Sequence, residues 1–249
     1  MAIVIKSPHE IQLMRRAGQI VAEVLEILQA AVRPGLTTGE LDQLADQQIR
    51  ARGAIPSFKG YRGFPASLCV AVNEEIVHGI PGRRVLRPGD IVSLDVGAIY
   101  KGYQGDAAVT VPVGDIPPAV QRLLDVTRES LAAAIVVARP GNRLGDISWA
   151  IQHCAEAAGL GVVREYGGHG IGRQLHEDPH IPNVGTPGRG PRLRRGMTLA
   201  LEPMLVLGQA QTRVLADNWT VVTSDGALAA HFEHTIAITN GEAEILTRL

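Results

Sequence analysis

The stretch SLDVGAIYKGYQGDAAVT, residues 93–110, decides the fold. Its two apolar arms flank Lys101 and Gly102, and alternating side chains on either side of such turn residues predict two antiparallel strands in a tight hairpin. Asp95 lies in the first arm and Asp106 in the second, and the midpoint between them falls between Tyr100 and Lys101, at these turn residues. We therefore expect the hairpin to set the two aspartates side by side. Carboxylates ~4 Å apart repel by roughly 4 kcal/mol at an effective dielectric of 20, so this placement indicates a compensating cation.

Two further apolar runs carry an acid in the same way. GMTLALEPML contains Glu202 and HFEHTIAIT contains Glu233, and both runs are predicted as strands with the acid inside. Because residues alternate faces along a strand, each of the four acids shares its face mostly with small side chains, while large apolar residues line the opposite faces. The acid faces leave room for a cavity. His169 lies in a glycine-rich stretch between the two pairs, and this oxygen-rich set with one imidazole predicts a two-metal site.

Composition and length are those of a globular protein with one large domain or two small ones. The 249 residues are 45 % hydrophobic and 20 % charged, and a formal net charge of −1 gives no case for a nucleic-acid partner. Two cysteines, Cys69 and Cys154, are too few for a disulfide framework and fit a reducing compartment. We see neither a signal-peptide core nor a run of ~18 apolar residues, so we expect a cytoplasmic protein without membrane contact.

Four amphipathic helices are predicted, over residues 7–33, 37–53, 117–139 and 144–159. A capping box at Ser7 begins the first helix. An Arg-Pro-Gly run ends both the first and the third, and these two runs are 106 residues apart. The same offset relates the second helix to the fourth, because Gly53 matches Gly159. The helical part of the chain therefore repeats.

The strands repeat as well. RPGDIVSLDVG at 87–97 aligns with RRGMTLALEPM at 194–204, which sets Asp95 on Glu202; likewise Asp106 falls on Glu233 and His78 on His169. We predict a single domain over residues 1–249, built as a pseudo-twofold duplication with halves of about 1–112 and 113–249. The simplest architecture is α+β, an antiparallel sheet with helices on one face. The metal site is expected where the halves meet.

Five long segments carry a resemblance to a known family. They are VNEEIVHGIP at 72–81, SLDVGAIYKGYQGDAAVT at 93–110, REYGGHGIGRQLHEDP at 164–179, GMTLALEPM at 196–204 and DNWTVVTSDGALAAHFEHTI at 217–236. With them the chain resembles the type I methionine aminopeptidases, minimal members of the pita-bread metallopeptidases, over essentially its whole length. The resemblance implies the pita-bread fold, with a dinuclear metal site at its centre.

The resemblance also implies the ligands of two divalent cations, which could be Co, Mn, Fe(II) or Zn. One cation is expected on Asp95, Asp106 and Glu233, and the other on Asp106, His169, Glu202 and Glu233. The implied reaction is removal of the N-terminal methionine of nascent proteins and peptides, with a small second residue favoured. A water or hydroxide that bridges the two metals would attack the first carbonyl.

Three residues take catalytic roles by the same resemblance. Glu202 is the expected proton carrier between the water and the leaving amine. His176 is expected to stabilise the oxyanion, and His78 to hold the scissile amide or its leaving nitrogen. The residues implied for the methionine pocket are Phe58, Tyr61, Phe64, Cys69, His78, Leu175, His176 and Trp219. Phe58, Phe64 and Leu175 differ from the commonest residues of the family but stay apolar, so methionine should still fit.

Two other functions compete with this hypothesis. A proline-specific pita-bread aminopeptidase or dipeptidase would carry an additional N-terminal domain, whereas here the first helix is predicted from residue 8. A catalytically silent, ribosome-associated relative would have lost ligands, whereas all five ligand positions hold the expected residue types. We expect a monomer. The role implies contact with the ribosome near the exit of the nascent chain, although no motif marks it.

The remaining histidines and one tryptophan receive simpler interpretations. His231 has no ligand partner in register and is expected to be a surface or packing residue, as are His9, His153 and His180. His234 is expected to pack on the opposite side of its strand from Glu233. Trp149 lies on the apolar stripe of the predicted helix 144–159, so we expect it in the core.

Overall fold

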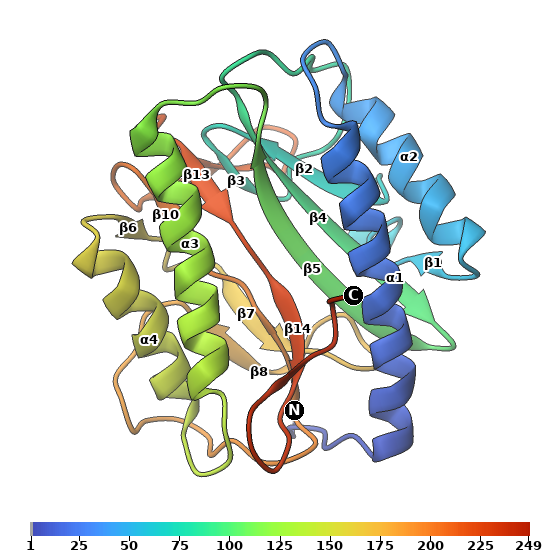
Figure 1. Cartoon of the computed structure of the whole chain (residues 1–249), viewed down its shortest axis with the longest axis vertical. Coiled ribbons are helices and arrows are strands. Elements are labelled where there is room, and N and C mark those ends of the chain that lie inside the picture. The colour runs from blue at the N-terminus through green and yellow to red at the C-terminus, as the bar shows by residue number, and fades with distance from the viewer. Residues whose placement is uncertain (1) are drawn as a thin grey trace.

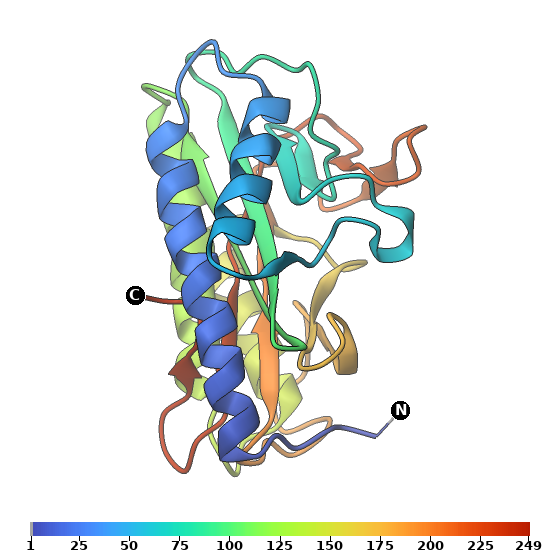
Figure 2. The same ribbon diagram turned by 90° about the vertical axis from the view of Figure 1, so that its right-hand side faces the viewer.

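The structure is a computed structural model that describes residues 2–249. Four α-helices occur in this range: α1 (Pro8–Ala31), α2 (Thr38–Ala51), α3 (Pro118–Val137) and α4 (Leu144–Ala157). Each begins and ends within two residues of its predicted bounds. Figure 1 shows α1 and α2 beside one group of strands and α3 and α4 beside the other. Figure 2 shows α1 and α3 on the same side of the strands, so the helices cover one face as predicted.

The strands are short apart from one hairpin. They are β1 (Ile55–Pro56), β2 (Leu68–Val72), β3 (Glu75–Val77), β4 (Ile91–Tyr100), β5 (Tyr103–Pro112), β6 (Gly161–Val162), β7 (Gly167–Gly170), β8 (Glu177–Pro182), β9 (Thr198–Leu201), β10 (Met204–Val206), β11 (Thr212–Val214), β12 (Val221–Thr223), β13 (Ala229–His231), β14 (His234–Ala237) and β15 (Glu244–Ile245). Among the described residues they pair antiparallel in four sheets rather than one. The α+β class is confirmed, and the single sheet is replaced by several.

The helix starts follow from local chemistry. In α1 the Ser7 side chain accepts from the backbone N–H of Glu10, and the Glu10 carboxylate accepts from the backbone N–H of Ser7. Thr37 and Glu40 repeat this capping box at α2. Such pairs satisfy backbone N–H groups that have no partner inside the helix. The helices then bury their apolar stripes against the strands.

The hairpin β4–β5 forms around Lys101 and Gly102 as predicted, but its register differs. Tyr100 pairs with Tyr103, so Asp95 lies opposite Ala108 rather than opposite Asp106. The two-residue loop is centred one residue later than the midpoint of the two aspartates. Asp95 and Asp106 are therefore diagonal neighbours on the same face, which still brings carboxylates within reach of each other. The expectation that they lie directly side by side is wrong by one diagonal step.

Glu202 and Glu233 do not lie inside strands, contrary to the prediction. Glu202 follows β9 and precedes β10, and Glu233 lies between β13 and β14. The pairs β9–β14 and β10–β13 belong to different sheets but share one register, so the two glutamates face each other where the ladder is interrupted. Pro203 cannot donate to a ladder, which explains the break on one side. Both segments of the chain, 198–206 and 229–237, pass from one sheet to the other at a glutamate.

The first and second halves of the chain meet along residues 106–110 and 231–235. Glu233 N–H donates to the carbonyl of Ala108 at 2.9 Å. On either side of this bond a threonine hydroxyl replaces direct backbone pairing. Thr235 Oγ1 accepts from the N–H of Asp106 at 3.0 Å and donates to its carbonyl at 2.7 Å. Thr110 Oγ1 does the same for the N–H and carbonyl of His231, both at 2.8 Å. We call this contact the seam.

Apolar packing surrounds the seam on the helix side. One buried cluster joins α1 and α2 to β2, β4 and β5, and another joins α3 and α4 to β9, β10 and β14. Trp149 is a correction: it is 43 % exposed and stacks on His153 at 4.6 Å, so it is not a core residue. Residues 2–249 contain no helix that is both long and apolar enough to cross a membrane.

Candidate metal centre

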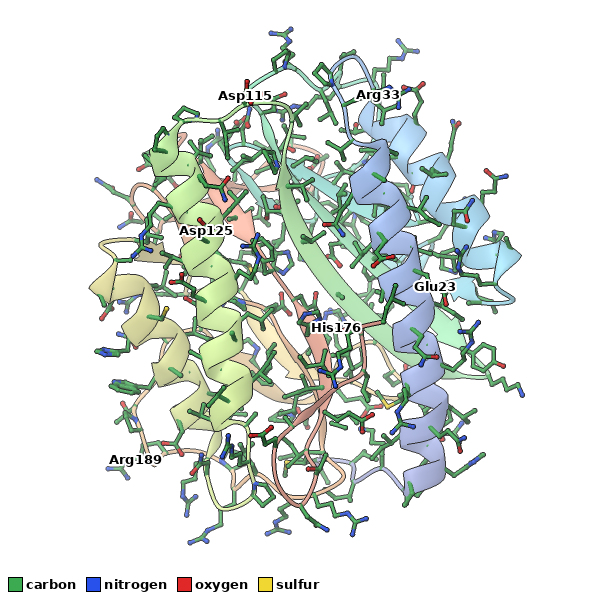
Figure 3. The ribbon with its side chains drawn as sticks, viewed as in Figure 1. Glu23, Arg33, Asp115, Asp125, His176 and Arg189 are labelled. Carbon is green, nitrogen blue, oxygen red and sulfur yellow. The ribbon has the colours of Figure 1, made fainter. Side chains whose placement is uncertain are left out.

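One cavity collects all of the predicted site residues. Its volume is about 130 Å³, and its lining comprises Phe58, Tyr61, Arg62, Phe64, Cys69, His78, Asp95, Asp106, His169, Leu175, His176, Glu202, Trp219 and Glu233. Figure 3 shows His176 near the middle of the molecule, whereas Arg33 and Arg189 lie at its edge. Only Arg62 in this lining lies outside the predicted set. The cavity opens between segments from both halves of the chain.

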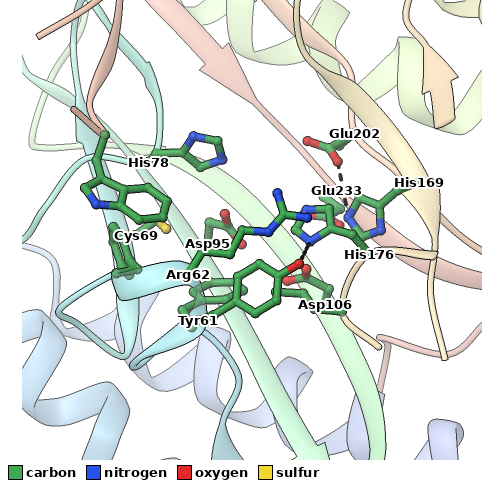
Figure 4. A pocket seen from close by; sticks show the side chains of 14 residues that line it. Tyr61, Arg62, Cys69, His78, Asp95, Asp106, His169, His176, Glu202 and Glu233 are labelled. Carbon is green, nitrogen blue, oxygen red and sulfur yellow. Dashed lines mark hydrogen bonds and ion pairs between the residues drawn. The ribbon is translucent and has the colours of Figure 1, made fainter. Parts of the chain in front are cut away.

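Five polar side chains form one end of the cavity. Ligand atoms of Asp106, His169 and Glu233 all lie within 4.8 Å of one another. Glu202 adjoins them, because its Oε1 lies 3.6 Å from His169 Nε2. Asp95 approaches Asp106 from the neighbouring strand, diagonally across the β4–β5 ladder. Figure 4 shows Asp95, Asp106, His169, Glu202 and Glu233 gathered at this end of the cavity.

The raised pKa values of the four acids show that their ionised forms are unfavourable without a cation. Burial raises the pKa of Asp95 to about 7. Burial, followed by the charges of Glu233 and Asp95, raises the pKa of Asp106 well above its usual value. The pKa values of Glu202 and Glu233 are raised in the same way, first by burial and then by neighbouring acids. Close like charges in a low-dielectric site cannot all ionise unless a positive charge is present.

Buried oxygens without partners support the same conclusion. Asp95 Oδ1, Asp106 Oδ1 and Glu233 Oε1 are buried and accept no hydrogen bond. Buried polar atoms are normally paired, so such exceptions need an explanation. Hard divalent cations take carboxylate oxygens, and several transition metals also accept imidazole nitrogen. The donor set therefore fits a metal centre.

His169 is prepared as a ligand by its backbone. Its Nδ1 lies 2.9 Å from the carbonyl oxygen of Gly170, so an Nδ1–H donor there leaves the Nε2 lone pair directed at the acids. Burial lowers the pKa of His169 to about 4, which favours the neutral ring. The flanking glycines are required by space: a Cβ at Gly168 would collide with the carbonyl of Ala200, and one at Gly170 with the carbonyl of Asp178.

His176 stands at the other side of this cluster. Its ring centroid is 4.2 Å from that of His169, and its Nδ1 lies 2.9 Å from the hydroxyl of Tyr61. Figure 4 marks this hydrogen bond. Burial lowers the pKa of His176 to about 3, with smaller contributions from His169 and the Arg62 cation. A neutral ring that accepts at Nδ1 keeps Nε2–H as a donor.

The loop that carries His176 is tied to the start of the described chain. The ammonium of Lys6 forms an ion pair with Glu177 at 2.5 Å, and the two side chains are 3 % and 11 % exposed. Lys6 also donates its backbone N–H to the carbonyl of Gly196 at 2.8 Å. A buried, hydrogen-bonded pair of this kind is costly to break from one side. It therefore anchors the loop next to the cavity.

His78 enters the cavity from a strained turn. Its φ is 60°, a region that residues other than glycine rarely adopt. Strain of this kind persists where surrounding structure enforces it, often at functional sites. The ring stacks edge-on against Tyr166 and Trp219, with centroid distances of 5.8 and 6.2 Å. Burial lowers the pKa of His78, so this ring is also favoured in its neutral form.

The remaining lining is apolar and forms a slot beside the polar end. Phe64 packs edge-on against Trp219 at 5.1 Å, and Phe58, Cys69 and Leu175 are each under 10 % exposed. Phe58 fits because residue 97 is glycine: a Cβ there would lie 2.7 Å from the Phe58 ring. Burial raises the pKa of the Cys69 thiol, so this cysteine is part of the wall and not a thiolate nucleophile.

Three residues of the site escaped the sequence analysis. His231 is 2 % exposed, so it is not a surface residue, and its Nε2 lies 3.6 Å from Glu202 Oε2, beside the acid cluster. Asn183 donates from Nδ2 to the backbone carbonyl of Glu202 at 3.0 Å. Arg62 reaches over the Tyr61 ring at 5.2 Å. Strand parity could have revealed His231, because it shares the face of Glu233; the other two have no local signal.

The fold and the acid cluster together define a metal-dependent hydrolase class. The model of metallopeptidase family M24 matches residues 12–240. Methionine aminopeptidase 1 of Bacillus subtilis is 56 % identical over 99 % of this chain and 100 % of its own length. Methionine aminopeptidase 1 of Mycobacterium tuberculosis is 50 % identical over 97 % and 94 %. The chain belongs to metallopeptidase family M24, whose activity requires divalent metal ions.

Solved structures agree with this assignment. The methionine aminopeptidase of Thermotoga maritima superimposes with a TM-score of 0.98, at 50 % identity, over 100 % of both chains. The prolidase of Pyrococcus horikoshii gives a TM-score of 0.79 at 22 % identity, and the match covers 98 % of this chain but 63 % of the prolidase. The second likeness shows the pita-bread fold alone.

Proposed function

We propose that this protein removes the N-terminal methionine from nascent proteins and peptides. The single observation that carries the proposal is one cavity in which five metal-ligand side chains adjoin an apolar slot. The curated relatives named methionine aminopeptidase, identical at half or more of their positions, support the same substrate. A free amino terminus would lie at the polar end, and an unbranched thioether side chain fits the slot.

Five residues would hold two divalent cations. Asp95, Asp106 and Glu233 would bind one, and Asp106, His169, Glu202 and Glu233 the other. The converging ligand atoms and the unpaired buried oxygens support this assignment. When bound, such cations supply Lewis-acid chemistry that lowers the pKa of water and polarises a carbonyl. The oxygen-rich set with one imidazole accepts Mn, Fe(II), Co or Zn.

The side chains around the scissile bond divide the remaining tasks. Glu202 would take the proton of the attacking water and pass it to the leaving amine. His176, which can accept from Tyr61 at Nδ1, would donate from Nε2 to the oxyanion; such a donor is typically worth ~2.7–4 kcal/mol of barrier. His78 would hold the scissile amide. The crowded mouth of the slot would favour a small second residue.

The surroundings of the reaction follow from the same role. We place the protein in the cytoplasm, where Cys69 and Cys154 would remain free thiols as they are here. It would act as a monomer of one catalytic domain, residues 1–249, with duplicated halves. Its substrates would leave the ribosome with methionine exposed, which makes contact with the ribosome part of the proposal.

Mass spectrometry of short peptides tests the function. The metal-free protein is incubated with and without Mn²⁺ or Co²⁺ and offered Met-Ala-Ser, Met-Leu-Ser, Leu-Ala-Ser, Ala-Pro-Ser and N-acetyl-Met-Ala-Ser. We expect only Met-Ala-Ser to lose its first residue, and only with metal. Cleavage of Ala-Pro-Ser would favour the proline-specific alternative. If no peptide is cut with any metal, a silent binding protein becomes the better account.

A further inference from the structure

His231 is the one imidazole at the metal centre that has no role in the proposed reaction. Its side chain is 2 % exposed, and its Nε2 accepts or donates no hydrogen bond. That nitrogen lies 3.6 Å from Glu202 Oε2 and 4.0 Å from Glu233 Oε2. A buried polar atom without a partner, directed at two carboxylates, points to an interaction that completes when the cluster is filled.

The backbone under His231 is fixed from both directions. Its N–H and its carbonyl both bond to the hydroxyl of Thr110 at 2.8 Å. In the ladder β10–β13 it pairs with Met204, one residue beyond Pro203. The position of the His231 ring is therefore set by its backbone, and the Glu202 side chain has to adjust to it. Rigid support of this kind is what a residue needs in order to orient a ligand.

The two oxygens of Glu202 face two different imidazoles. Oε1 lies 3.6 Å from His169 Nε2, and Oε2 lies 3.6 Å from His231 Nε2. His169 is held with its Nδ1 against the carbonyl of Gly170, so its Nε2 offers a lone pair beside Oε1. That side suits a cation. Beside Oε2, where oxygens of two carboxylates face His231, only an N–H donor is favourable.

We propose that His231 is a positioning residue for Glu202. Its Nε2–H donates to Glu202 Oε2 and turns Oε1 toward the metal position that Glu202 shares with His169. This inference rests on the proposed function and adds a support that the ligand set does not contain. Glu202 needs such support because it lies in an interrupted ladder and has a longer side chain than either aspartate. Asn183 holds its backbone carbonyl, and His231 holds its carboxylate.

Substitutions at position 231 separate donation from packing. His231→Gln keeps an N–H donor near the position of Nε2, whereas His231→Leu keeps volume without a donor. His234→Leu is the matched control, because His234 is the adjacent partly buried imidazole and bonds to Thr247 on the other side of the strand at 2.9 Å. Calorimetric titration of each metal-free protein with Mn²⁺ gives cation affinity. Steady-state kinetics on Met-Ala-Ser give kcat and KM separately.

We expect His231→Leu to weaken Mn²⁺ binding by about 10- to 100-fold, the usual cost of removing an outer support of a metal ligand. The kcat should fall in parallel while KM changes by less than about 3-fold. His231→Gln should recover most of both losses, and the absorption spectrum of the Co²⁺-loaded protein should shift in His231→Leu but not in His231→Gln. His234→Leu should match the wild-type affinity.

Two results would overturn the proposal. One is wild-type Mn²⁺ affinity in folded His231→Leu. The other is a loss in His231→Gln as large as in His231→Leu, because the shape of the ring would then matter and not its N–H. If His231→Leu does not fold, His231→Asn serves instead, since its shorter donor cannot reach Glu202. Mn²⁺ affinity tests positioning even if the wild-type protein cuts no peptide, so the two proposals fail separately.

Discussion

The two halves of the chain present their acids on different kinds of backbone. Asp95 and Asp106 lie within β4 and β5, a continuous hairpin of ten-residue strands. Glu202 and Glu233 lie at breaks, where β9 gives way to β10 and β13 to β14. In the hairpin the ladder itself fixes the short carboxylates. At the breaks, Asn183 donates to the backbone carbonyl of Glu202, and His231 Nε2 lies 3.6 Å from Glu202 Oε2.

This difference shows two ways to hold repelling charges in a protein interior. A regular ladder separates the aspartates by one diagonal step, which limits their repulsion without further parts. The interrupted ladder sets the glutamates directly opposite each other, and polar groups must then orient them. We call the continuous hairpin with Asp95 and Asp106 the rigid side, and the interrupted ladder with Glu202 and Glu233 the adjustable side. We therefore expect substitutions in the hairpin and at the breaks to fail in different ways.

The largest effect is expected from removing a central ligand on the rigid side. Asp106→Asn takes one carboxylate from the cluster formed with His169 and Glu233, and a lost metal contact is worth several kcal/mol of transition-state stabilisation. Activity on Met-Ala-Ser should fall by about 10³-fold or more. Circular dichroism should show an intact fold. If activity stays within 10-fold of wild type at saturating metal, the proposed ligand set is wrong.

The pH dependence of metal-free stability should reveal the charge on the hairpin. The folded-state pKa of Asp95 is raised from 3.8 to about 7. The contribution of this group to the free energy of unfolding is therefore fully present below pH ~4 and is lost as pH rises toward 7. Asp95→Asn removes this loss. The stability of the variant relative to wild type, measured by urea unfolding in chelator, should therefore increase between pH 4 and 7 by a few kcal/mol. A constant difference across this range would contradict a raised pKa for Asp95.

Thr235→Val tests how the two halves are joined. The change leaves the buried N–H and carbonyl of Asp106 without their shared hydroxyl, at a cost of about 3 kcal/mol in the free energy of unfolding. Thr186→Val, a change of an exposed threonine, is the control and should cost well under 1 kcal/mol. Chemical denaturation measures both. Equal stabilities would show that the hydroxyl in the seam adds nothing.

The smallest effect is expected at the support of the adjustable side. Asn183→Leu removes the donor to the Glu202 carbonyl and should cost about 1 kcal/mol of stability with a measurable loss of Mn²⁺ affinity. Asn142→Leu is the matched change, because Asn142 Nδ2 also donates to a backbone carbonyl, that of Val137 at 2.8 Å, and Asn142 does not line the cavity. It should cost similar stability and leave Mn²⁺ affinity unchanged. Loss of affinity in both variants would mean that global stability, and not positioning, is being measured.

Local signals in the sequence predicted the elements well. The capping box at Ser7 predicted the start of α1, and Arg-Pro-Gly runs predicted the ends of α1 and α3, because those signals act within one turn of the helix end. Lys101 and Gly102 predicted the hairpin. Its register was missed by one diagonal step, since the midpoint of two aspartates does not determine where a two-residue loop is centred. The breaks at Glu202 and Glu233 were missed because a change of sheet depends on partners far along the chain.

The residues of the candidate site could be predicted only where the alternation of side chains along a strand or the likeness to the family identifies them. The acids and His169 were found by pattern, and the structure brings them into one cavity. His231 lies two residues before Glu233, but the spacing of metal ligands does not identify a residue that is not itself a ligand. Asn183 and Arg62 lie in segments whose approach to the cavity is set by tertiary packing. No local pattern contains that information.

The ion pair between Lys6 and Glu177 has a consequence for the order in which the protein is made. The two residues are 171 positions apart, so Lys6 leaves the ribosome long before its partner exists. The loop that carries His176 can reach its anchored position only after Glu177, in the second half of the chain, has emerged. Long-range contacts of this kind form late and slowly. A newly made copy would therefore acquire this part of its active site among the last steps of its own maturation.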